Sequence, residues 1–141
     1  MIQAPKPAGN ERREFFRLNF NAPLQFKSYS IERPGKSQAQ PAVTSEGSSK
    51  NISPSGILFQ TRQNPPTVSS VLWMNLDLRT LNICQEIEKR ALIFNNGLLG
   101  RVVRVEEDPE NESLYDVGVC FLTQDQRNSR EVKQLLSELS Q

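Results

Sequence analysis

The sequence has no histidine, only two cysteines and a single tryptophan among its 141 residues. Without histidine, nucleophilic sites of the Ser-His or Cys-His type and histidine-based zinc sites are excluded. Cys84 and Cys120 lie far apart in the chain, each among apolar neighbours. We therefore expect two buried thiols rather than a disulfide or a metal site.

The chain also lacks long apolar runs and a strong net charge. No run approaches the roughly 18 residues that a membrane span needs, and residues 1–10 have no apolar core of the secretory-signal type, so we expect a cytoplasmic protein without a membrane span. The formal net charge is only +1, which argues against duplex nucleic acid as the main partner. Small anions held locally remain compatible with this charge.

The acidic residues between 106 and 112 gather in one polar stretch, which we predict to be a solvated loop between two strands. Hydrolytic acid–base chemistry needs two carboxylates with different environments in a cleft, and a loop of like charges does not provide them. We therefore expect neither an enzymatic activity nor a cofactor.

Alternating apolar and polar residues, the pattern of half-buried strands, cover most of the chain. In Leu18–Phe26 the even positions are apolar, and Pro23 on the polar side indicates an unpaired edge or a bulge. Trp73 lies on the other face of its strand and indicates a second apolar surface. Further strands are predicted at 42–49, 56–62, 71–81, 98–106 and 114–122.

Two segments are less regular. Residues 28–50 are rich in Ser, Pro, Gly, Gln and Lys, and we predict a long flexible loop with a short strand near its end. Residues 83–94 fit either a short helix or a strand. The turn signal Asn95-Asn96-Gly97 directly afterwards favours a hairpin.

The C-terminal residues change to helical spacing, with Val132, Leu135, Leu136 and Leu139 on one stripe and Asp125 or Thr123 as N-cap. This helix either covers a barrel or docks a partner or a second copy. Six or seven strands before one helix predict a mainly β fold, a small antiparallel barrel with a C-terminal helix. We divide the chain into a flexible tail (1–10), a barrel domain (11–123) and the helix (124–141).

Two arginines, Arg13 and Arg17, lie four residues apart before the first alternating segment. A guanidinium group is permanently charged, and its forked donors match phosphate oxygens and the O6 and N7 acceptors of guanine. In a charged segment such a pair is more often a solvated cluster. The spacing alone is therefore compatible with both an anion site and an ordinary surface.

The segment Asn51–Gly56, N-I-S-P-S-G, fits a type I turn with Pro54 at the second position and Gly56 at the fourth. Such a turn needs no ligand. It also does not need Asn51 or Ser53, whose amide and hydroxyl groups can serve a base edge and a phosphate.

Together the two segments resemble the signature motifs of the PilZ domain, R-x-x-x-R and D/N-x-S-x-x-G. Arg13 and Arg17 match the first motif, and Asn51, Ser53 and Gly56 match the second. The strand sequences G-R-V-V-R and Y-D-V-G-V-C-F-L are similar to barrel strands of that family, so the resemblance covers residues 11–123.

This resemblance implies a PilZ-type β-barrel that is a bacterial receptor for cyclic di-GMP. It implies that Arg13 and Arg17 hold guanine edges and phosphates. Asn51 and Ser53 would contact a guanine and the sugar–phosphate ring, and Gly56 would permit close backbone approach. The arginine segment would close over the ligand and change the surface offered to an effector protein.

Arg12 is a candidate contact to a second ligand molecule, as in family members that bind a stacked pair. Two alternatives remain open. One is a non-enzymatic PilZ-like adaptor of pilus or motility assembly that binds protein rather than nucleotide. The other is a single-strand nucleic-acid binder that stacks bases on Phe15, Phe16 and Phe20. The number of ligands, the downstream process, and a monomer or homodimer also stay open, as do the roles of the 28–50 loop and the 79–94 segment.

Overall fold

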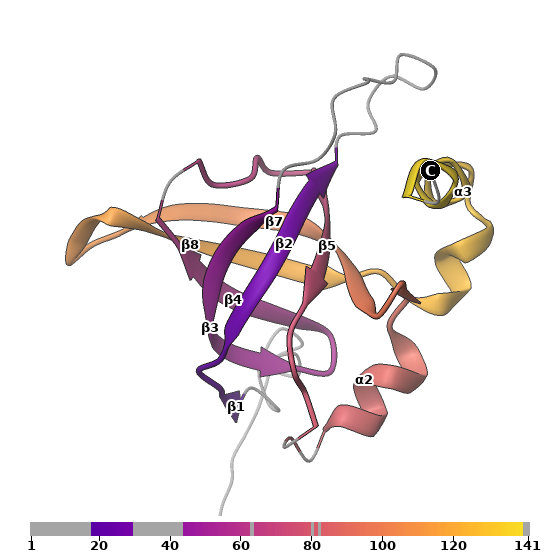
Figure 1. The fold of residues 1–141 in the computed structure, drawn as a ribbon, viewed down its shortest axis with the longest axis horizontal. Helices are drawn as coiled ribbons and strands as arrows, with labels where there is room; N and C mark the ends of the chain where they lie inside the picture. Colours follow the sequence, from indigo (N-terminus) through magenta and orange to yellow (C-terminus); the bar gives the residue numbers. More distant parts are fainter. Residues whose placement is uncertain (1–17, 30–43, 63, 80, 82, 140–141) are drawn as a thin grey trace, which may run out of the picture.

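The structure is a computed structural model that describes residues 18–29, 44–62, 64–79, 81 and 83–139 (Figure 1). Its strands are β1 (Leu18–Asn19), β2 (Pro23–Tyr29), β3 (Ser45–Ser53), β4 (Gly56–Thr61), β5 (Val71–Asn75), β6 (Ile93–Phe94), β7 (Gly97–Asp108) and β8 (Asn111–Phe121). Its helices are α2 (Cys84–Arg90), the 3-10 helix η1 (Gln124–Asn128) and α3 (Arg130–Leu139).

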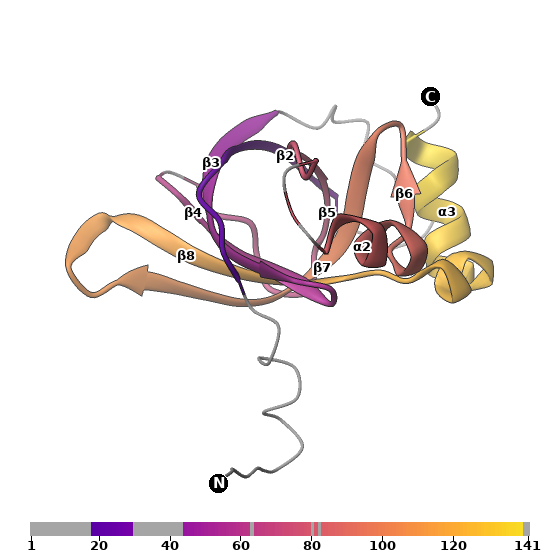
Figure 2. The ribbon, with the colours of Figure 1, turned by 90° about the horizontal axis from the view of Figure 1, so that it is seen from below.

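Six of these strands close into an antiparallel barrel, as the alternating sequence predicts. The hydrogen-bonded order is β3-β2-β5-β7-β8-β4, and β4 pairs back with β3 to complete the ring. Figure 2 shows this ring with α2 and α3 on one side and the long β7–β8 hairpin projecting on the other. The short strands β1 and β6 add to β3 and β7. The mainly β fold with a barrel and a C-terminal helix is thus confirmed.

Inward-facing side chains of all six strands fill the barrel. Leu24 and Phe26 of β2 are both 2% exposed, and the Phe26 ring packs 4.9 Å from that of Phe59. The predicted single strand from Leu18 to Phe26 is nevertheless interrupted, because residues 20–22 leave regular pairing between β1 and β2. Pro23 begins β2 and pairs only with β3, so its missing N–H leaves no ladder bond unmade.

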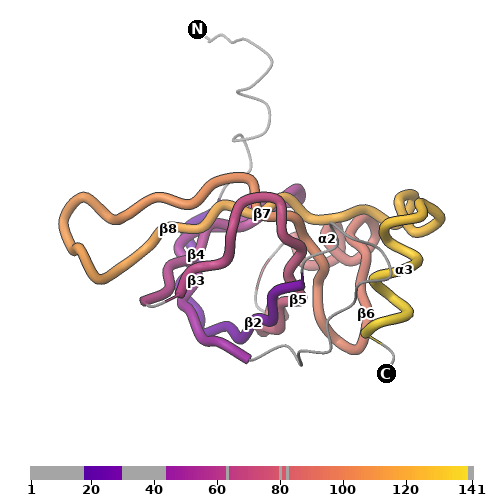
Figure 3. The backbone as a smooth tube through the Cα atoms, turned by 90° about the horizontal axis from the view of Figure 1, so that it is seen from above, coloured from indigo at the N-terminus to yellow at the C-terminus, as the bar shows by residue number. Residues whose placement is uncertain are grey.

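A second apolar layer lies outside the barrel, under α3, as the position of Trp73 predicts. Val132 and Leu135 of α3 are buried against Leu99 and Leu122, which face outward from β7 and the end of β8. Trp73 packs against the same cluster, and its indole N–H donates to the Phe94 carbonyl at 2.8 Å. The helix therefore flanks the barrel (Figure 3).

The hairpin predicted for residues 83–94 is wrong in its first half, where the helix α2 forms instead. Ile87 and Ala91 are four residues apart, so they lie on one helical face, and both are buried in the barrel core. Only Ile93 and Phe94 pair with β7. The turn at Asn95-Asn96 is confirmed, since both residues have positive φ, as a type I′ hairpin requires.

Three further boundaries differ from the prediction. The 28–50 loop is shortened, because β2 runs to Tyr29 and β3 begins at Ser45; residues 30–43 lie outside the described part. The strand 71–81 ends at Asn75, and part of the remaining segment turns back to pack on the barrel core. The acidic stretch is not a loop but the extended end of the β7–β8 hairpin, which pairs out to Asp108 and Asn111.

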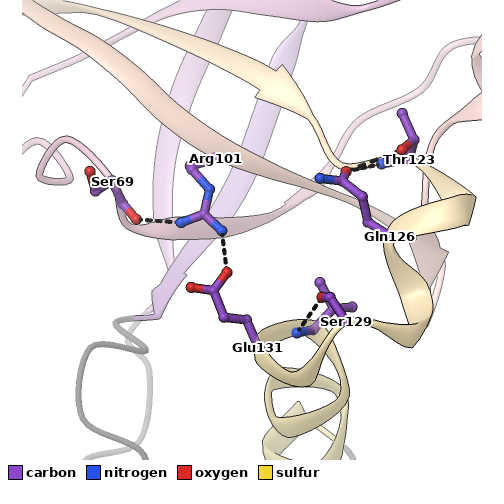
Figure 4. A network of polar contacts seen from close by, with 7 residues as sticks. Ser69, Arg101, Thr123, Gln126, Ser129 and Glu131 are labelled. Atoms are coloured by element: carbon purple, nitrogen blue, oxygen red, sulfur yellow. Dashed lines mark hydrogen bonds and ion pairs between the residues drawn. The ribbon is translucent and has the colours of Figure 1, made fainter.

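The C-terminal helix begins later than predicted. Thr123 precedes η1, and its backbone N–H donates to the Gln126 side chain at 2.7 Å. Ser129 then caps α3, because its hydroxyl accepts a hydrogen bond from the Val132 N–H at 3.2 Å. Arg101 of β7 ties the helix to the barrel through Glu131 at 3.0 Å and to the Ser69 carbonyl at 3.1 Å (Figure 4).

Candidate functional site

An open depression of about 390 Å³ lies on the outer face of the barrel over four neighbouring strands. Its volume falls in the range of about 300 to 1,000 Å³ that is usual for small-molecule sites. It is lined by Asn51 and Ser53 of β3, Ser55 of the connecting turn, Gly56, Ile57 and Leu58 of β4, Val103 and Arg104 of β7, and Gly118, Val119 and Cys120 of β8. The N-x-S-x-x-G segment therefore forms one wall.

Two glycines form the floor of the depression. Gly56 pairs with Cys120, and a Cβ placed on Gly56 would collide with the Val119 carbonyl oxygen. A Cβ on Gly118 would lie 3.6 Å from the Arg104 Cβ, an ordinary contact. Gly56 is therefore required by strand packing, whereas Gly118 leaves space that the fold does not need.

The turn between β3 and β4 consists of Pro54 and Ser55, as predicted, with Ser53 opposite Gly56. The Ser53 hydroxyl accepts a hydrogen bond from the Ser55 N–H at 3.2 Å, and the two hydroxyl oxygens also lie 3.2 Å apart. Ser53 is 5% exposed, while Ser55 is exposed at the rim. The Ser53 hydroxyl thus stabilises the turn, and Ser55 presents the more accessible hydroxyl.

Asn51 and Arg104 are the main polar side chains beside the glycine floor. Within the described part of the chain, the Asn51 amide makes no hydrogen bond, so its donors and acceptor are free for a ligand. Arg104 forms an ion pair with Glu106 at 3.9 Å, and its side chain is 52% exposed. Together they place an amide and a guanidinium group around one hollow.

A β-bulge brings Arg104 to this surface. The pairing of β7 with β8 shifts between Val102 and Arg104, so Val103 is the extra residue. Val103 and Arg104 are both exposed, and Val102 faces the core. Simple alternation would have placed Arg104 on the inward side with Val102. This is why the sequence pattern did not mark it as a site residue.

The predicted arginine residues Arg12, Arg13 and Arg17 lie outside the described part of the chain. The structure does describe the residues that follow them. Leu18 pairs with Ile52 and Asn19 pairs with Asn51, so β1 runs beside the motif strand β3. Paired residues of antiparallel strands share a face, and Asn19 therefore stands on the same face as Asn51.

The prediction of two buried thiols is wrong for Cys120, which is exposed within the depression. Its apolar neighbours Val119 and Phe121 face the core, so alternation along β8 turns Cys120 outward. Cys84 is half-buried, and burial, together with Glu88, raises the pKa of its thiol. The strand sequence Y-D-V-G-V-C-F-L could have predicted the outward positions of Gly118 and Cys120, because these two residues alternate with the apolar residues of that strand.

Two larger hollows of about 590 Å³ each lie elsewhere on the described surface. One is bordered by Glu46, Gln60 and Arg62, and the other by Asp77, Cys84 and Glu88. In the second, the Arg79 side chain donates two hydrogen bonds to the Asp77 carboxylate and its backbone N–H donates a third, and these bonds lower the pKa of that group well below its usual range. Neither hollow includes a residue of the predicted motifs.

Two chemical possibilities can be checked over the described residues. No group of three or more His, Cys, Asp or Glu side chains is arranged there to hold a metal ion. None of the described helices combines the length and apolar character of a membrane span.

The fold defines the class of this protein, and a match to a family model defines its family. The fold is a closed six-stranded antiparallel barrel with a covering C-terminal helix, and the PilZ domain model matches residues 11–138. The chain therefore belongs to the PilZ domain family. The match covers nearly the whole chain, including α3.

Among solved structures, the chain is similar to the Bacillus subtilis inhibitor of motility, MotI/DgrA. The two are 13% identical with a TM-score of 0.47, over 89% of this chain. The chain spans about half of that protein, 51% of its length. A comparison with curated protein sequences returned no match.

Proposed function

We propose that this chain is a cytoplasmic receptor for cyclic di-GMP that uses the depression over β3, β4, β7 and β8. In this proposal the chain is not an enzyme; it binds the dinucleotide and presents a changed surface to an effector protein. Arg13 and Arg17 hold guanine edges and phosphates, and Asn51 and the turn at Ser53 supply the facing wall. Arg12 is the additional cation for a second ligand molecule.

One observation carries this proposal. β1 pairs with β3 at Leu18 and Asn19, directly beside Asn51 and Ile52. Arg17 is the residue before Leu18 in the chain. The residues directly after the first motif therefore lie beside the second motif, more than thirty residues away in sequence, where the Asn51 amide has no partner in the described chain. This arrangement supports a site that both motifs share.

Arg104 adds to the proposed site. Its exposed guanidinium group borders the depression across Gly118 from Asn51, where it can meet a phosphate or a guanine face. The glycine floor lets a flat base approach the backbone closely, because no Cβ fills the space at Gly118. These features favour a planar, anionic ligand over an apolar one.

Titration calorimetry with cyclic di-GMP tests the proposal. The double variant Arg13→Ala plus Arg17→Ala should bind at least tenfold more weakly, because each bidentate arginine–guanine contact is worth about 1 to 3 kcal/mol. Arg127→Ala plus Arg130→Ala is the matched control, since it removes the same charge from exposed positions on the helical side. Absence of binding by the intact chain, or equal losses in both variants, would overturn the proposal.

A chemical probe locates the ligand independently. Cys120 is exposed within the depression, so bound cyclic di-GMP should slow its reaction with a maleimide. The Cys84→Ser background isolates this signal from the second thiol. Unchanged labelling of Cys120 under saturating ligand would place the binding site elsewhere. The same assay with a linear dinucleotide separates ring recognition from general anion binding.

The adaptor alternative predicts a different outcome. An adaptor that binds only protein would show no heat with cyclic di-GMP, and its capture of an effector protein would not depend on nucleotide. A receptor should capture its effector to different extents with and without cyclic di-GMP. Performing both measurements on one preparation separates the two functions.

A further inference from the structure

The junction between β1 and β2 contains an irregularity that one buried side chain resolves. Three residues separate Asn19 from Pro23, whereas only two separate their partners Asn51 and Ser48. The junction strand is therefore one residue longer than β3 opposite it. This extra residue prevents regular ladder pairing of the junction backbone.

Backbone bonds satisfy only part of this junction. The Phe20 N–H donates to the Lys50 carbonyl at 3.0 Å, and the Ser49 N–H donates to the Ala22 carbonyl at 2.9 Å. Within the described chain, the Ala22 N–H and the Phe20 carbonyl have no backbone partner. Both groups instead meet the Ser49 hydroxyl.

The Ser49 hydroxyl bridges these two groups through hydrogen bonds. It accepts a hydrogen bond from the Ala22 N–H at 3.0 Å and donates one to the Phe20 carbonyl. Ser49 is 1% exposed, so water cannot readily replace it. On its other side β3 also changes register, with Lys50 as the extra residue between Ser49 and Asn51 in the pairing with β4. The Ser49 hydroxyl thus lies where β3 pairs irregularly with the β1–β2 junction on one side and with β4 on the other.

We propose that Ser49 is a positioning residue for ligand binding. By fixing the junction, its hydroxyl holds β1 against Asn51 and Ile52, and so sets the point beside the motif strand at which the preceding arginine segment joins the barrel. Ser49 itself faces the buried junction and does not line the depression. This inference rests on the proposed function, because only a ligand shared by Arg17 and Asn51 makes the register of β1 matter for affinity.

Calorimetry of Ser49→Ala with cyclic di-GMP tests this role. We expect about a tenfold loss of affinity, which corresponds to about 1.4 kcal/mol. Ser48→Ala is the matched control, because Ser48 is exposed on the neighbouring position of the same strand and should bind like the intact chain. Wild-type affinity in Ser49→Ala, with the intact chain binding normally, would overturn this inference but not the proposed function.

A double-mutant cycle distinguishes positioning from a general structural effect. If Ser49 acts through the arginine segment, Ser49→Ala should cause no further loss when Arg13 and Arg17 are already alanine. A full further loss in that background would overturn the inference. Faster hydrogen exchange at the Ala22 amide should accompany the loss of affinity, and unchanged exchange would also count against it.

A second variant tests the role of β1 pairing without changing the buried Ser49 side chain. Leu18→Pro removes a backbone donor from β1 at a position that is 36% exposed, so the barrel should tolerate it. Its affinity should fall as in Ser49→Ala, with unchanged thermal unfolding. A folded Leu18→Pro protein with the affinity of the intact chain would show that β1 pairing does not position the ligand contacts.

Discussion

Along β8 the outward-facing side chains change from Leu122, through Cys120, to Gly118, and the outer face of the barrel changes with them. Leu122 is buried under α3, Cys120 is exposed at the boundary, and Gly118 forms the floor of an open depression. β7 shows the same change, from buried Leu99 to exposed Arg104. The same two strands thus form a sealed region under α3, around Leu99 and Leu122, and next to it an open region at the depression, around Arg104 and Gly118.

The two regions differ in the side chains that they present, and the β-bulge at Val103 adds Arg104 to the surface of the open region. The sealed region presents large apolar groups that α3 covers with Val132 and Leu135. The open region presents glycine, the exposed guanidinium group of Arg104 and the Asn51 amide, which has no partner among the described residues. Water can solvate these groups without a covering element. A barrel of this size can therefore use one outer face for stability and the adjacent face for binding.

The largest expected effect is on the sealed region. Leu135 is 0% exposed, and Leu135→Ala should lower the free energy of unfolding by about 2 to 5 kcal/mol because it leaves a cavity under α3. Chemical denaturation measures this change, with the exposed Ser137→Ala as control. Affinity for cyclic di-GMP, measured where the variant is folded, should stay unchanged. A parallel loss of affinity would show that the two regions are coupled.

The reciprocal change is Gly118→Leu in the open region. A Cβ at this position makes an ordinary contact, 3.6 Å from that of Arg104, and the rest of the leucine side chain would occupy space in the depression. Affinity for cyclic di-GMP should fall at least tenfold, or about 1.4 kcal/mol, while the denaturation midpoint stays the same. Gly118→Ala should have a smaller effect on binding. If Gly118→Leu binds normally, the ligand does not occupy this hollow.

A smaller effect is expected at the start of α3. The Ser129 hydroxyl caps the helix through the Val132 N–H, and Ser129→Ala should cost about 1 kcal/mol of unfolding free energy. Ser129→Asp keeps an acceptor at the cap and should retain stability. Equal destabilisation by both variants would mean that the cap does not hold α3 on the barrel.

Much of the fold follows from local pattern. Alternation predicted most strands, turn-forming residues predicted the Pro54 turn and the Asn95-Asn96 turn, and helical spacing predicted α3. Residues 84–90 were misassigned because Ile87 in the helix and Ala91 directly after it are four residues apart, a spacing that also satisfies alternation over so short a segment. Local periodicity cannot distinguish a helix from a strand when the segment has only two buried apolar residues to define its pattern.

The candidate site was harder to predict because long-range pairing builds it. Asn51 and Ser53 were predicted as site residues because the turn does not need them and because they resemble the PilZ motif. Arg104 was not predicted as a site residue because the bulge at Val103 breaks the alternation of β7. Cys120 was predicted to be buried because its neighbours in the sequence are apolar. Gly118 reaches the motif strand only through the pairing of β8 with β4, where it lies opposite Leu58. No local pattern encodes that register.

The smallest expected effect tests what holds the sealed region closed. Arg101 binds both Glu131 of α3 and the Ser69 carbonyl, but the Arg101 and Glu131 side chains are 32% and 56% exposed (Figure 4). A double-mutant cycle with Arg101→Ala and Glu131→Ala should give a coupling energy of only about 0.2 to 1 kcal/mol, because solvent screens an exposed pair.

This coupling should shrink further in 1 M salt, where the screening length is about 3 Å. The two single variants should differ, since Arg101→Ala also removes the bond to Ser69, whereas Glu131→Ala removes only the ion pair. A coupling well above 1 kcal/mol that survives high salt would assign the attachment of α3 to charge. It would then contradict the view that the packing of Leu135 and Val132 distinguishes the sealed face from the open one.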